Sequence, residues 1–391
     1  MPITLNNEAA IVGIGQTEYS KNSGRSELQL ACEATAAAIV DAGLTPADID
    51  GMTTFTMDTS DEIEIARAVG IKDLTFFSRT PHGGGAAVGV IHQAAMAVAT
   101  GSAKAVVVYR SLNGRSGARY SEGVSGGATT SDLIHWSWYM PSGLMTPASW
   151  VAMFTQRYMY ETGCTSEDLG RLCVGQRNHA VKNPASFFYE KPLTLAEHQS
   201  ARAIVDPLRL YDCCQETDGG TACIVTTPER ARDLDCGGAA IIRSVAQAAG
   251  ADQEVMTSFY RPSLSTLPEM DLVAKQNWEM SGLTSDDIDA AVIYDAFSSI
   301  ILWQLESFGF CKPGEAKDFI KDGALELGGR LPTNTHGGQL SEAYIHGMNG
   351  VNEGVRLIRG TSYNQPEKND HVLVTAGVGI PTSAMILGQL D

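Results

Sequence analysis

Short apolar runs alternate with longer amphipathic stretches along most of the chain, and this pattern predicts its secondary structure. The apolar runs predict β-strands over residues 10–14, 52–57, 105–109, 222–226, 239–245, 290–293 and 372–375. The amphipathic stretches predict helices over residues 26–41, 86–100, 150–162, 166–182, 268–280 and 297–308. Strands that alternate with helices are typical of an α/β fold.

One short segment occurs twice. Residues 42–50 read AGLTPADID and residues 281–289 read SGLTSDDID, and each follows a predicted helix and precedes a predicted strand. Gly43 and Gly282 stand where a helix commonly ends on a residue with positive φ. Chance identity is the alternative over so short a stretch, but the shared context favours duplication. We therefore expect a duplicated α/β unit with two sheets and a shared helical layer.

The segment between the two copies has a different character. Residues 115–215 begin with a glycine- and serine-rich run, continue through an aromatic-rich piece and contain two predicted helices without a clear series of strands. We expect an inserted, mostly helical domain over 115–215. It would separate an amino-terminal half, 1–114 completed by about 216–232, from a carboxy-terminal half, 233–391. Surface insertions of this size often carry substrate contacts.

Composition and charge narrow the classes of function. The chain has 391 residues, 43% of them hydrophobic, which is ordinary for a globular enzyme. No run approaches twenty apolar residues and the first residues lack a signal-peptide pattern, so we expect a cytoplasmic protein without a membrane span. The net charge of −17 argues against nucleic acid as a partner. The eight cysteines show no metal-site spacing, so we expect reduced thiols and no metal.

Several longer strings resemble one known superfamily. The opening AIVGIGQTEYSKNSG, the string QRYMYETG at 156–163 and the string DPLRLYDCCQETDGGTA at 206–222 are similar to motifs of the sterol-carrier-protein-like, or lipid-transfer-protein-like, branch of the thiolase superfamily. The resemblance implies a thiolase fold, with a duplicated βαβαβαββ unit layered α/β/α/β/α and an inserted helical loop domain. The alternative reading of VGIGQTE as a dinucleotide fingerprint lacks the third glycine that this motif requires.

The thiolase nucleophile is missing. A thiolase places a cysteine at a helix N-terminus, where the thiolate is favoured and takes the acyl group from a thioester. The matching string here, SRTPHGGGAAVGVIHQAAMAVATG at 78–101, has Gly85 at that position. No cysteine occurs between Cys32 and Cys164, so a shifted alignment does not restore the nucleophile.

Three further catalytic motifs of the superfamily are altered. The asparagine that starts the Asn-Glu-Ala-Phe motif corresponds to Tyr294, which Asp295 follows. The histidine of the Gly-Gly…Gly-His-Pro motif corresponds to Tyr344, with His346 two residues on. The Cys-x-Gly motif corresponds to residues 375–377, with Gly379 close behind. These replacements leave two interpretations, a decayed site or a rebuilt one.

Two tyrosines favour a rebuilt site, because phenols transfer protons. Simple packing of Tyr294 and Tyr344 is the alternative. His346 is a candidate second acid or base, with a structural donor as its alternative. His82 and Asp295 are candidate pocket residues. Backbone amides near Gly85 and Gly379 are candidates for the oxyanion hole of a thioester enolate.

Chains of this branch that lack the cysteine resemble the steroid side-chain-cleaving aldolases. The implied reaction is retro-aldol cleavage of a steroid β-hydroxyacyl-CoA to a ring ketone and a short acyl-CoA, expected to be propionyl-CoA, without a covalent intermediate. The coenzyme A thioester is the substrate and no cofactor is expected. The resemblance also implies a homodimer and an OB-fold, acyl-CoA-associated partner protein. Two alternatives remain, a non-catalytic acyl-CoA- or sterol-binding subunit and an atypical acyltransferase. The sequence leaves open the steroid, the roles of the two tyrosines and the residues that hold the coenzyme A phosphates.

Overall fold

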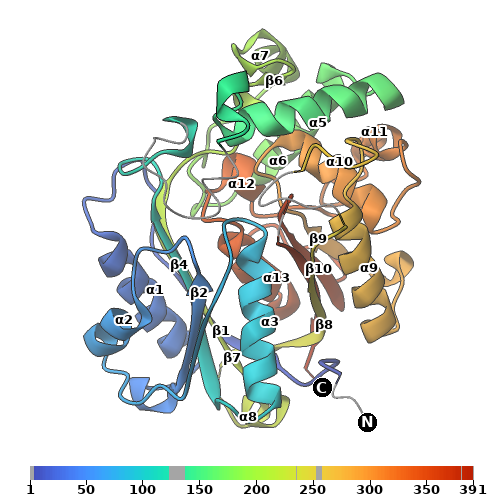
Figure 1. The fold of residues 1–391 in the computed structure, drawn as a ribbon. Coiled ribbons are helices and arrows are strands. Elements are labelled where there is room, and N and C mark those ends of the chain that lie inside the picture. Colours follow the sequence, from blue (N-terminus) through green and yellow to red (C-terminus); the bar gives the residue numbers. More distant parts are fainter. Residues whose placement is uncertain (1–3, 123–136, 235, 252–257, 380, 391) are drawn as a thin grey trace.

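The computed structural model describes residues 4–122, 137–234, 236–251, 258–379 and 381–390. Nine strands form one sheet in the order β3-β2-β4-β7-β1-β8-β11-β10-β9 (Figure 1). Their bounds are β1 Ala10–Gln16, β2 Gly51–Phe55, β3 Phe76–Thr80, β4 Ala105–Asn113, β7 Asp218–Thr226, β8 Ala240–Ala248, β9 Ala290–Val292, β10 His371–Ala376 and β11 Thr382–Gln389.

The sheet consists of two halves that meet at β1 and β8. Only two residue pairs join these strands, Ala10 with Ile241 and Ile11 with Ala240. Within each half, parallel outer strands are followed by antiparallel inner ones: β2 pairs parallel with β4 and β4 antiparallel with β7, while β9 pairs parallel with β10 and β10 antiparallel with β11. The two halves thus repeat one pairing pattern, as the duplication predicts.

Helices cover both faces of each half and give five layers (Figure 1). The helices are α1 Glu27–Asp41, α2 Glu62–Val69, α3 Ala86–Ala99, α8 Pro228–Asp233, α9 Pro268–Ser281, α10 Ser298–Ser307, α11 Ala316–Phe319, α12 Gly338–Ser341 and α13 Met348–Arg359. Helix α1 packs on β1, β4 and β7, and α9 packs on β8 and β11, while α3 and α13 contact strands of both halves. Their apolar side chains form a continuous buried core between the halves, as expected for the shared middle layer. The arrangement confirms the thiolase fold.

The repeated segment has the same local structure in both copies. Thr45 and Thr284 each begin a 3₁₀ turn, Pro46–Asp48 and Ser285–Asp287, whose last aspartate accepts hydrogen bonds from the threonine backbone and hydroxyl. Gly43 and Gly282 have φ of +66° and +72°. The two halves differ at the third strand of the unit, which is β3 in the first half and an isolated bridge between Ala291 and Thr333 in the second.

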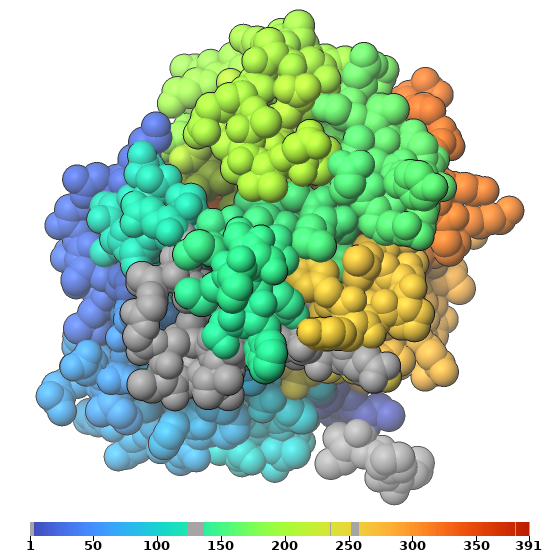
Figure 2. Space-filling view, turned by 45° about the horizontal axis from the view of Figure 1, so that its top comes forward, coloured from blue at the N-terminus to red at the C-terminus, as the bar shows by residue number. Residues whose placement is uncertain are grey.

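Residues 137–212 lie above the sheet, at the carboxyl ends of its parallel strands (Figure 1). They contain α5 Pro147–Thr162, α6 Ser166–Ala180, α7 Leu195–Ser200 and a two-stranded ribbon of β5 Ala203–Val205 and β6 Leu208–Arg209. In Figure 2 this green and yellow-green segment lies between the blue amino-terminal part and the gold and orange carboxy-terminal part. The domain boundaries after residues 114 and 215 stay a prediction. No helix among the described residues is both long and apolar enough to cross a bilayer.

Seven strands and helices of the sheet layers were not predicted from the sequence. They are α2, β3, α8, α11, α12, α13 and β11. Helix α13 contains Gly350 and Gly354, which lower helix propensity. A Cβ on either glycine would lie within 3 Å of a valine side chain of β9 or β10. The two glycines therefore let this helix approach the sheet closely, which is a tertiary requirement that propensity alone does not reveal.

Candidate active site

A cavity of about 500 Å³ lies between the carboxyl ends of the parallel strands and the segment above them. Met57 follows β2, Arg115 follows β4, Tyr294 follows β9 and Val378 follows β10, and all four line the cavity. Ligands of α/β folds commonly bind at this edge of the sheet. The apolar part of the wall comes mainly from Pro147, Ala148, Trp150, Val151, Ile204, Leu210 and Phe297.

The glycine-rich turn before α3 forms one wall of the cavity. Gly85 is the N-cap of α3 and has ordinary helical dihedrals, so only space restricts it. A Cβ built on Gly85 would lie 1.5 Å from the carbonyl oxygen of Pro381. The carbonyl oxygen of Gly85 accepts a hydrogen bond from Ser383 Oγ at 2.6 Å. A cysteine therefore does not fit at this position, and the loop after β10 occupies the space that a nucleophile would need.

Tyr294 lies just beyond β9, and its backbone is fixed by three side chains. The Tyr294 amide donates to Thr375 Oγ1 at 3.0 Å, and the Tyr294 carbonyl accepts from Gln304 Nε2 at 2.7 Å. The side-chain amide of Asn334 bonds to both the N–H and the carbonyl of the preceding residue, Ile293. The ring reaches the turn before α3, where a Cβ on Gly84 would lie 1.7 Å from Tyr294 Oη. The absence of a side chain at Gly84 makes room for this hydroxyl.

Tyr344 meets Tyr294 in the cavity. Tyr344 is partly buried, and its amide donates to Thr217 Oγ1 at 2.9 Å. Burial raises the pKa of both phenols. The hydrogen bond between their hydroxyls lowers the pKa of Tyr294 and raises that of Tyr344.

His346 lies against Tyr344 and a third tyrosine, Tyr120. Its ring centroid is 5.1 Å from that of Tyr344 and 5.3 Å from that of Tyr120, a tyrosine of the short 3₁₀ helix Tyr120–Glu122. The side chain is buried, and burial together with the charge of Arg110 holds the pKa of His346 well below its usual range. Its backbone has φ of +51°, which is uncommon for a residue other than glycine.

Three predicted pocket residues do not line the cavity. Asp295 is fully buried behind Tyr294 and accepts from the amides of Gln339 and Leu340 at 2.8 and 3.2 Å. Burial raises the pKa of Asp295 to about 7. His82 has φ of +65° and its amide donates to Thr56 Oγ1, so it shapes the turn before the glycines. Gly379 has φ of +89° in the loop beside Gly85, next to the cavity-lining Val378.

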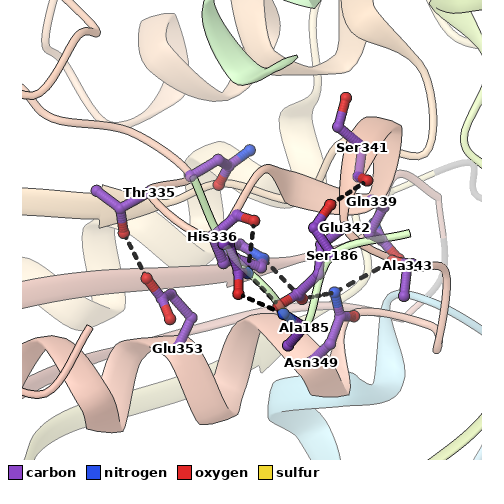
Figure 3. A network of polar contacts seen from close by, with 12 residues as sticks. Ala185, Ser186, Thr335, His336, Gln339, Ser341, Glu342, Ala343, Asn349 and Glu353 are labelled. Carbon is purple, nitrogen blue, oxygen red and sulfur yellow. Dashed lines mark hydrogen bonds and ion pairs between the residues drawn. The ribbon is translucent and has the colours of Figure 1, made fainter. Parts of the chain in front are cut away.

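A polar network supports the loop that carries Tyr344 and His346 (Figure 3). Its centre is the buried carboxylate of Glu342, which accepts from Asn183 Nδ2 at 3.0 Å and from Asn349 Nδ2 at 2.9 Å. The His336 Nε2 atom lies 3.8 Å from Glu342, and burial lowers the pKa of His336 to about 4. Ser186 Oγ donates to the Ser341 carbonyl at 2.8 Å. The network joins the loop to α13 and to the segment after α6, so it fixes the floor of the cavity.

Charged and thiol groups that the sequence analysis did not select also line the cavity. The charged ones are Arg115, Arg119, Arg177, Arg202 and Glu216, and the thiols are Cys213 and Cys214. Burial raises the pKa of Cys213 to about 12 and that of Cys214 well above its usual value, so both are protonated at neutral pH. Arg110, which lies behind the cavity, follows the run AVVVY in strand β4, and a charge directly after such a run is the signal that would have identified this residue.

One group of side chains has the composition of a metal site. Cys173, His198 and Asp212 are buried together and do not line the cavity themselves. The Asp212 Oδ1 atom already accepts from His198 Nε2 at 3.0 Å and from Ser298 Oγ at 2.6 Å. These hydrogen bonds connect α7 and α10 to the turn that contains Asp212, so the group has a structural role.

Comparisons with known proteins agree with this geometry. The model of the "Thiolase C-terminal domain-like" family matches residues 250–389. A "Steroid side-chain-cleaving aldolase" of Thermomonospora curvata is 60% identical over 97% of both chains. A "17-hydroxy-3-oxo-4-pregnene-20-carboxyl-CoA lyase" of Mycobacterium tuberculosis is 56% identical over 98% of this chain and 100% of its own. A solved structure titled "Ltp2-ChsH2(DUF35) aldolase" superposes with a TM-score of 0.95 at 58% identity and covers 100% of both chains.

Proposed function

The chain belongs to the family of steroid side-chain-cleaving aldolases within the thiolase superfamily, and we propose that its two cavity tyrosines perform the carbon–carbon bond cleavage of a steroid acyl-CoA. The chain is thus a lyase rather than a thiolase. One observation carries the proposal: Tyr294 and Tyr344 meet at the cavity wall where Gly85 has replaced the nucleophile.

The hydrogen bond between the phenols supports different roles for them. We assign the base role to Tyr294, the phenol whose pKa this hydrogen bond lowers, and the acid role to Tyr344, whose pKa it raises. Tyr294 reacts as the phenolate and takes the proton of the β-hydroxyl group, the carbon–carbon bond breaks, and a ring ketone and a thioester enolate form. Tyr344 then protonates the enolate carbon. A proton that passes from Tyr294 to Tyr344 restores the starting state, so no covalent intermediate is needed.

The two products follow from this balance. One is a steroid with a ketone on the ring carbon that carried the hydroxyl, and the other is a short acyl-CoA, for which propionyl-CoA is the proposed case. The apolar wall of α5 and the β5–β6 ribbon suits a steroid nucleus. Coenzyme A enters as part of the substrate, and we propose no further cofactor.

Two arginines are candidates for the phosphates of coenzyme A. Arg115 and Arg202 line the cavity, and neither forms an ion pair within the described part of the chain. Arg119, by contrast, is paired with Glu216 at 2.8 Å. Free guanidinium groups bind phosphate oxygens in a bidentate manner. In a chain with a net charge of −17, such cations are the local attraction that an anionic substrate requires.

The proposed assembly is a homodimer that works with a second protein. Strand β3 is an edge of the sheet and carries Phe77, which is 62% exposed, beside the 54% exposed Ile63. An edge strand with exposed apolar residues is suited to pairing with a second copy. The similar solved structure names a DUF35 component, and we propose a partner of that kind, with the OB-fold as its expected structure. The eight unpaired cysteines support a reducing compartment such as the cytoplasm.

The test is turnover of 17-hydroxy-3-oxo-4-pregnene-20-carboxyl-CoA, the compound named for the mycobacterial relative. The chain is assayed alone and with a DUF35-type partner, and products are identified by mass spectrometry. The expected products are the 17-ketone and an acyl-CoA in equal amounts. The same compound without its 17-hydroxyl group is the control and should not react. A complex that binds the substrate and forms neither product would show a non-catalytic subunit instead.

An atypical acyltransferase is the second candidate, because Cys213 and Cys214 lie in the cavity wall. Such an enzyme would form an acyl-thioester on one of them. Because burial keeps both thiols protonated, we expect Cys214→Ser to retain lyase turnover and no acyl-enzyme to accumulate. An acyl group found on either cysteine by mass spectrometry would favour the acyltransferase.

A further inference from the structure

A buried ion pair lies directly behind the cavity. Arg110 of β4 is 1% exposed, and its Nη1 atom donates to Asp58 Oδ2 at 2.9 Å and to the Ser111 carbonyl at 3.0 Å. Asp58 is also held by the amides of Ser60 and Ser111 at 2.9 and 3.1 Å. Both ions are fully desolvated, so the guanidinium is fixed in position and direction.

The guanidinium fixes the tautomer of the neighbouring imidazole. Arg110 Nε donates to His346 Nδ1 at 3.1 Å. An arginine side chain has five N–H donors and no acceptor, so His346 Nδ1 must present a lone pair to it. A neutral imidazole carries its single proton on the other nitrogen, which is Nε2. The positive charge of Arg110 and burial both oppose a second proton on the ring.

The protonated nitrogen faces the cavity. A Cβ on the cavity-lining Gly83 would lie 3.3 Å from His346 Nε2, so this atom borders the glycine-rich turn. Among the described residues none accepts a hydrogen bond from Nε2. The other neighbours of the ring are Phe55, Tyr120 and Tyr344, and Tyr120 shares a hydrogen bond with the same guanidinium. The ring therefore presents one fixed N–H group to a bound substrate.

We infer that His346 acts only as a hydrogen-bond donor through Nε2–H, and that Arg110, held by Asp58, is the positioning residue that enforces this role. His346 does not act as a base, because Nδ1 is occupied by Arg110 and Nε2 already carries a proton. This inference rests on the proposed function for the identity of its acceptor, the thioester oxygen that becomes negative when the carbon–carbon bond breaks. A preorganised donor at such an oxygen is worth about 10²–10³ in rate.

The tautomer can be measured without substrate. In protein labelled with ¹⁵N-histidine, the His346 signals are assigned by their loss in His346→Gln. The wild-type ring should show a protonated Nε2 and an unprotonated Nδ1 from about pH 6 to pH 9, without titration. A proton on Nδ1 or a titrating ring in this range would overturn the inference. This result does not depend on turnover, so it distinguishes a failure of the tautomer from a failure of the proposed function.

Removal of the ion pair tests the positioning role. The double variant Arg110→Met with Asp58→Leu deletes both charges together and leaves neither buried ion unpaired. His346 should then populate both tautomers and titrate. If the double variant keeps the wild-type Nε2–H pattern, Arg110 does not enforce it. The wild-type spectrum already tests the donor assignment if the double variant does not fold.

Turnover of the two His346 variants tests the donor role. Glutamine at position 346 retains an N–H donor, whereas leucine has none. We expect His346→Leu to lower kcat by about 10²–10³ with little change in KM, and His346→Gln to recover at least tenfold of that loss. Melting temperatures exclude unfolding as the cause. Equal losses in both variants, or wild-type turnover in His346→Leu, would overturn the donor role.

Discussion

At the scale of single residues, the site depends on the absence of side chains as much as on their presence. Gly84 and Gly85 are adjacent, yet each makes room for a different neighbour. Gly84 accommodates the hydroxyl of Tyr294, and Gly85 accommodates the backbone of the loop that contains Pro381. The two glycines therefore separate two effects, the position of a phenol and the closure of a loop, which substitution can test independently.

Gly84→Ala should displace Tyr294 without removing its hydroxyl. The new Cβ would lie 1.7 Å from Tyr294 Oη and 2.2 Å from Cζ, so the ring must move. If the position of this phenol is essential, turnover should fall by about 10²–10⁴, the contribution of one acid or base group. Gly328→Ala is the control, because a Cβ there has nothing within 4 Å. Unchanged single-turnover rates in a folded Gly84→Ala protein would contradict the assigned role.

Asp295 should make the fold less stable as the pH rises. An unfolded aspartate has a pKa of about 3.9, whereas burial raises the folded value to about 7. Between about pH 4 and pH 7 the folded protein therefore keeps Asp295 protonated, whereas the unfolded chain has lost that proton. The stabilisation of the fold by this proton is complete below about pH 4 and is lost as the pH rises through 7. The difference corresponds to on the order of 4 kcal/mol.

The variant Asp295→Asn is neutral at every pH and should remove this part of the pH dependence. Thermal unfolding is compared at about pH 5 and pH 8. The decrease in melting temperature from pH 5 to pH 8 should be smaller in Asp295→Asn than in the wild type. Asp370→Asn, at an exposed position, is the control and should retain the wild-type difference. An identical difference in Asp295→Asn would show that this carboxyl does not titrate as described.

At the scale of elements, the turn before α3 and the loop between β10 and β11 determine which chemistry the fold can support. A Cβ on Gly377 would lie 2.4 Å from the Cα of Gly85, so the two segments are in direct backbone contact. This contact fills the position that the nucleophile would occupy. Loss of thiolase chemistry therefore involves a repacked loop as well as one exchanged residue.

Gly85→Cys should accordingly fail to restore thiolase activity, and Gly85→Ala should destabilise the protein. Overpacking against a backbone oxygen costs about 1–3 kcal/mol or more. The control is Gly175→Ala, which lies in α6 with open space around it and should be neutral or stabilising. Thermal unfolding and a thiolysis assay measure the two effects. Thiolysis by Gly85→Cys at an unchanged melting temperature would contradict the packing described here.

The sequence predicted elements better than contacts. All seven predicted strands and all six predicted helices are present, because each has a clear apolar period. Tyr294, Tyr344 and Gly85 were found through altered motifs, and all three line the cavity. Arg110 and Asp58 were missed, because Arg110 bonds to Asp58, 52 positions away in the chain, and to His346, 236 positions away. No local pattern in the sequence reveals such a contact.

At the scale of the whole molecule, the free edge of the sheet and the charge of the surface govern association. Strand β3 pairs only with β2, and no described strand covers its other side. The net charge of −17 keeps copies apart unless apolar contacts outweigh the repulsion. In the proposed dimer, the exposed Phe77 and Ile63 at this edge would supply such contacts.

Phe77→Lys should convert the proposed dimer to a monomer, because it places a charge in the centre of the apolar edge. Light scattering after gel filtration measures the mass. Tyr363→Lys is the matched control, since Tyr363 is 61% exposed at the carboxyl side of α13, away from β3. The control should remain dimeric. A wild-type chain that is a stable monomer, or a Phe77→Lys chain that stays dimeric, would contradict the use of this edge.

The central claim is that two phenols replace the thiolase nucleophile, and single-turnover rates of Tyr294→Phe and Tyr344→Phe test it most directly. Each variant loses one hydroxyl and keeps its ring. The free energy of unfolding should therefore fall only by the contribution of one hydrogen bond, about 0.5–1.5 kcal/mol, and the melting temperature should change little. Turnover of the steroid β-hydroxyacyl-CoA should fall by about 10²–10⁴ in each. If either folded variant keeps more than half of the wild-type rate, that tyrosine is neither the acid nor the base.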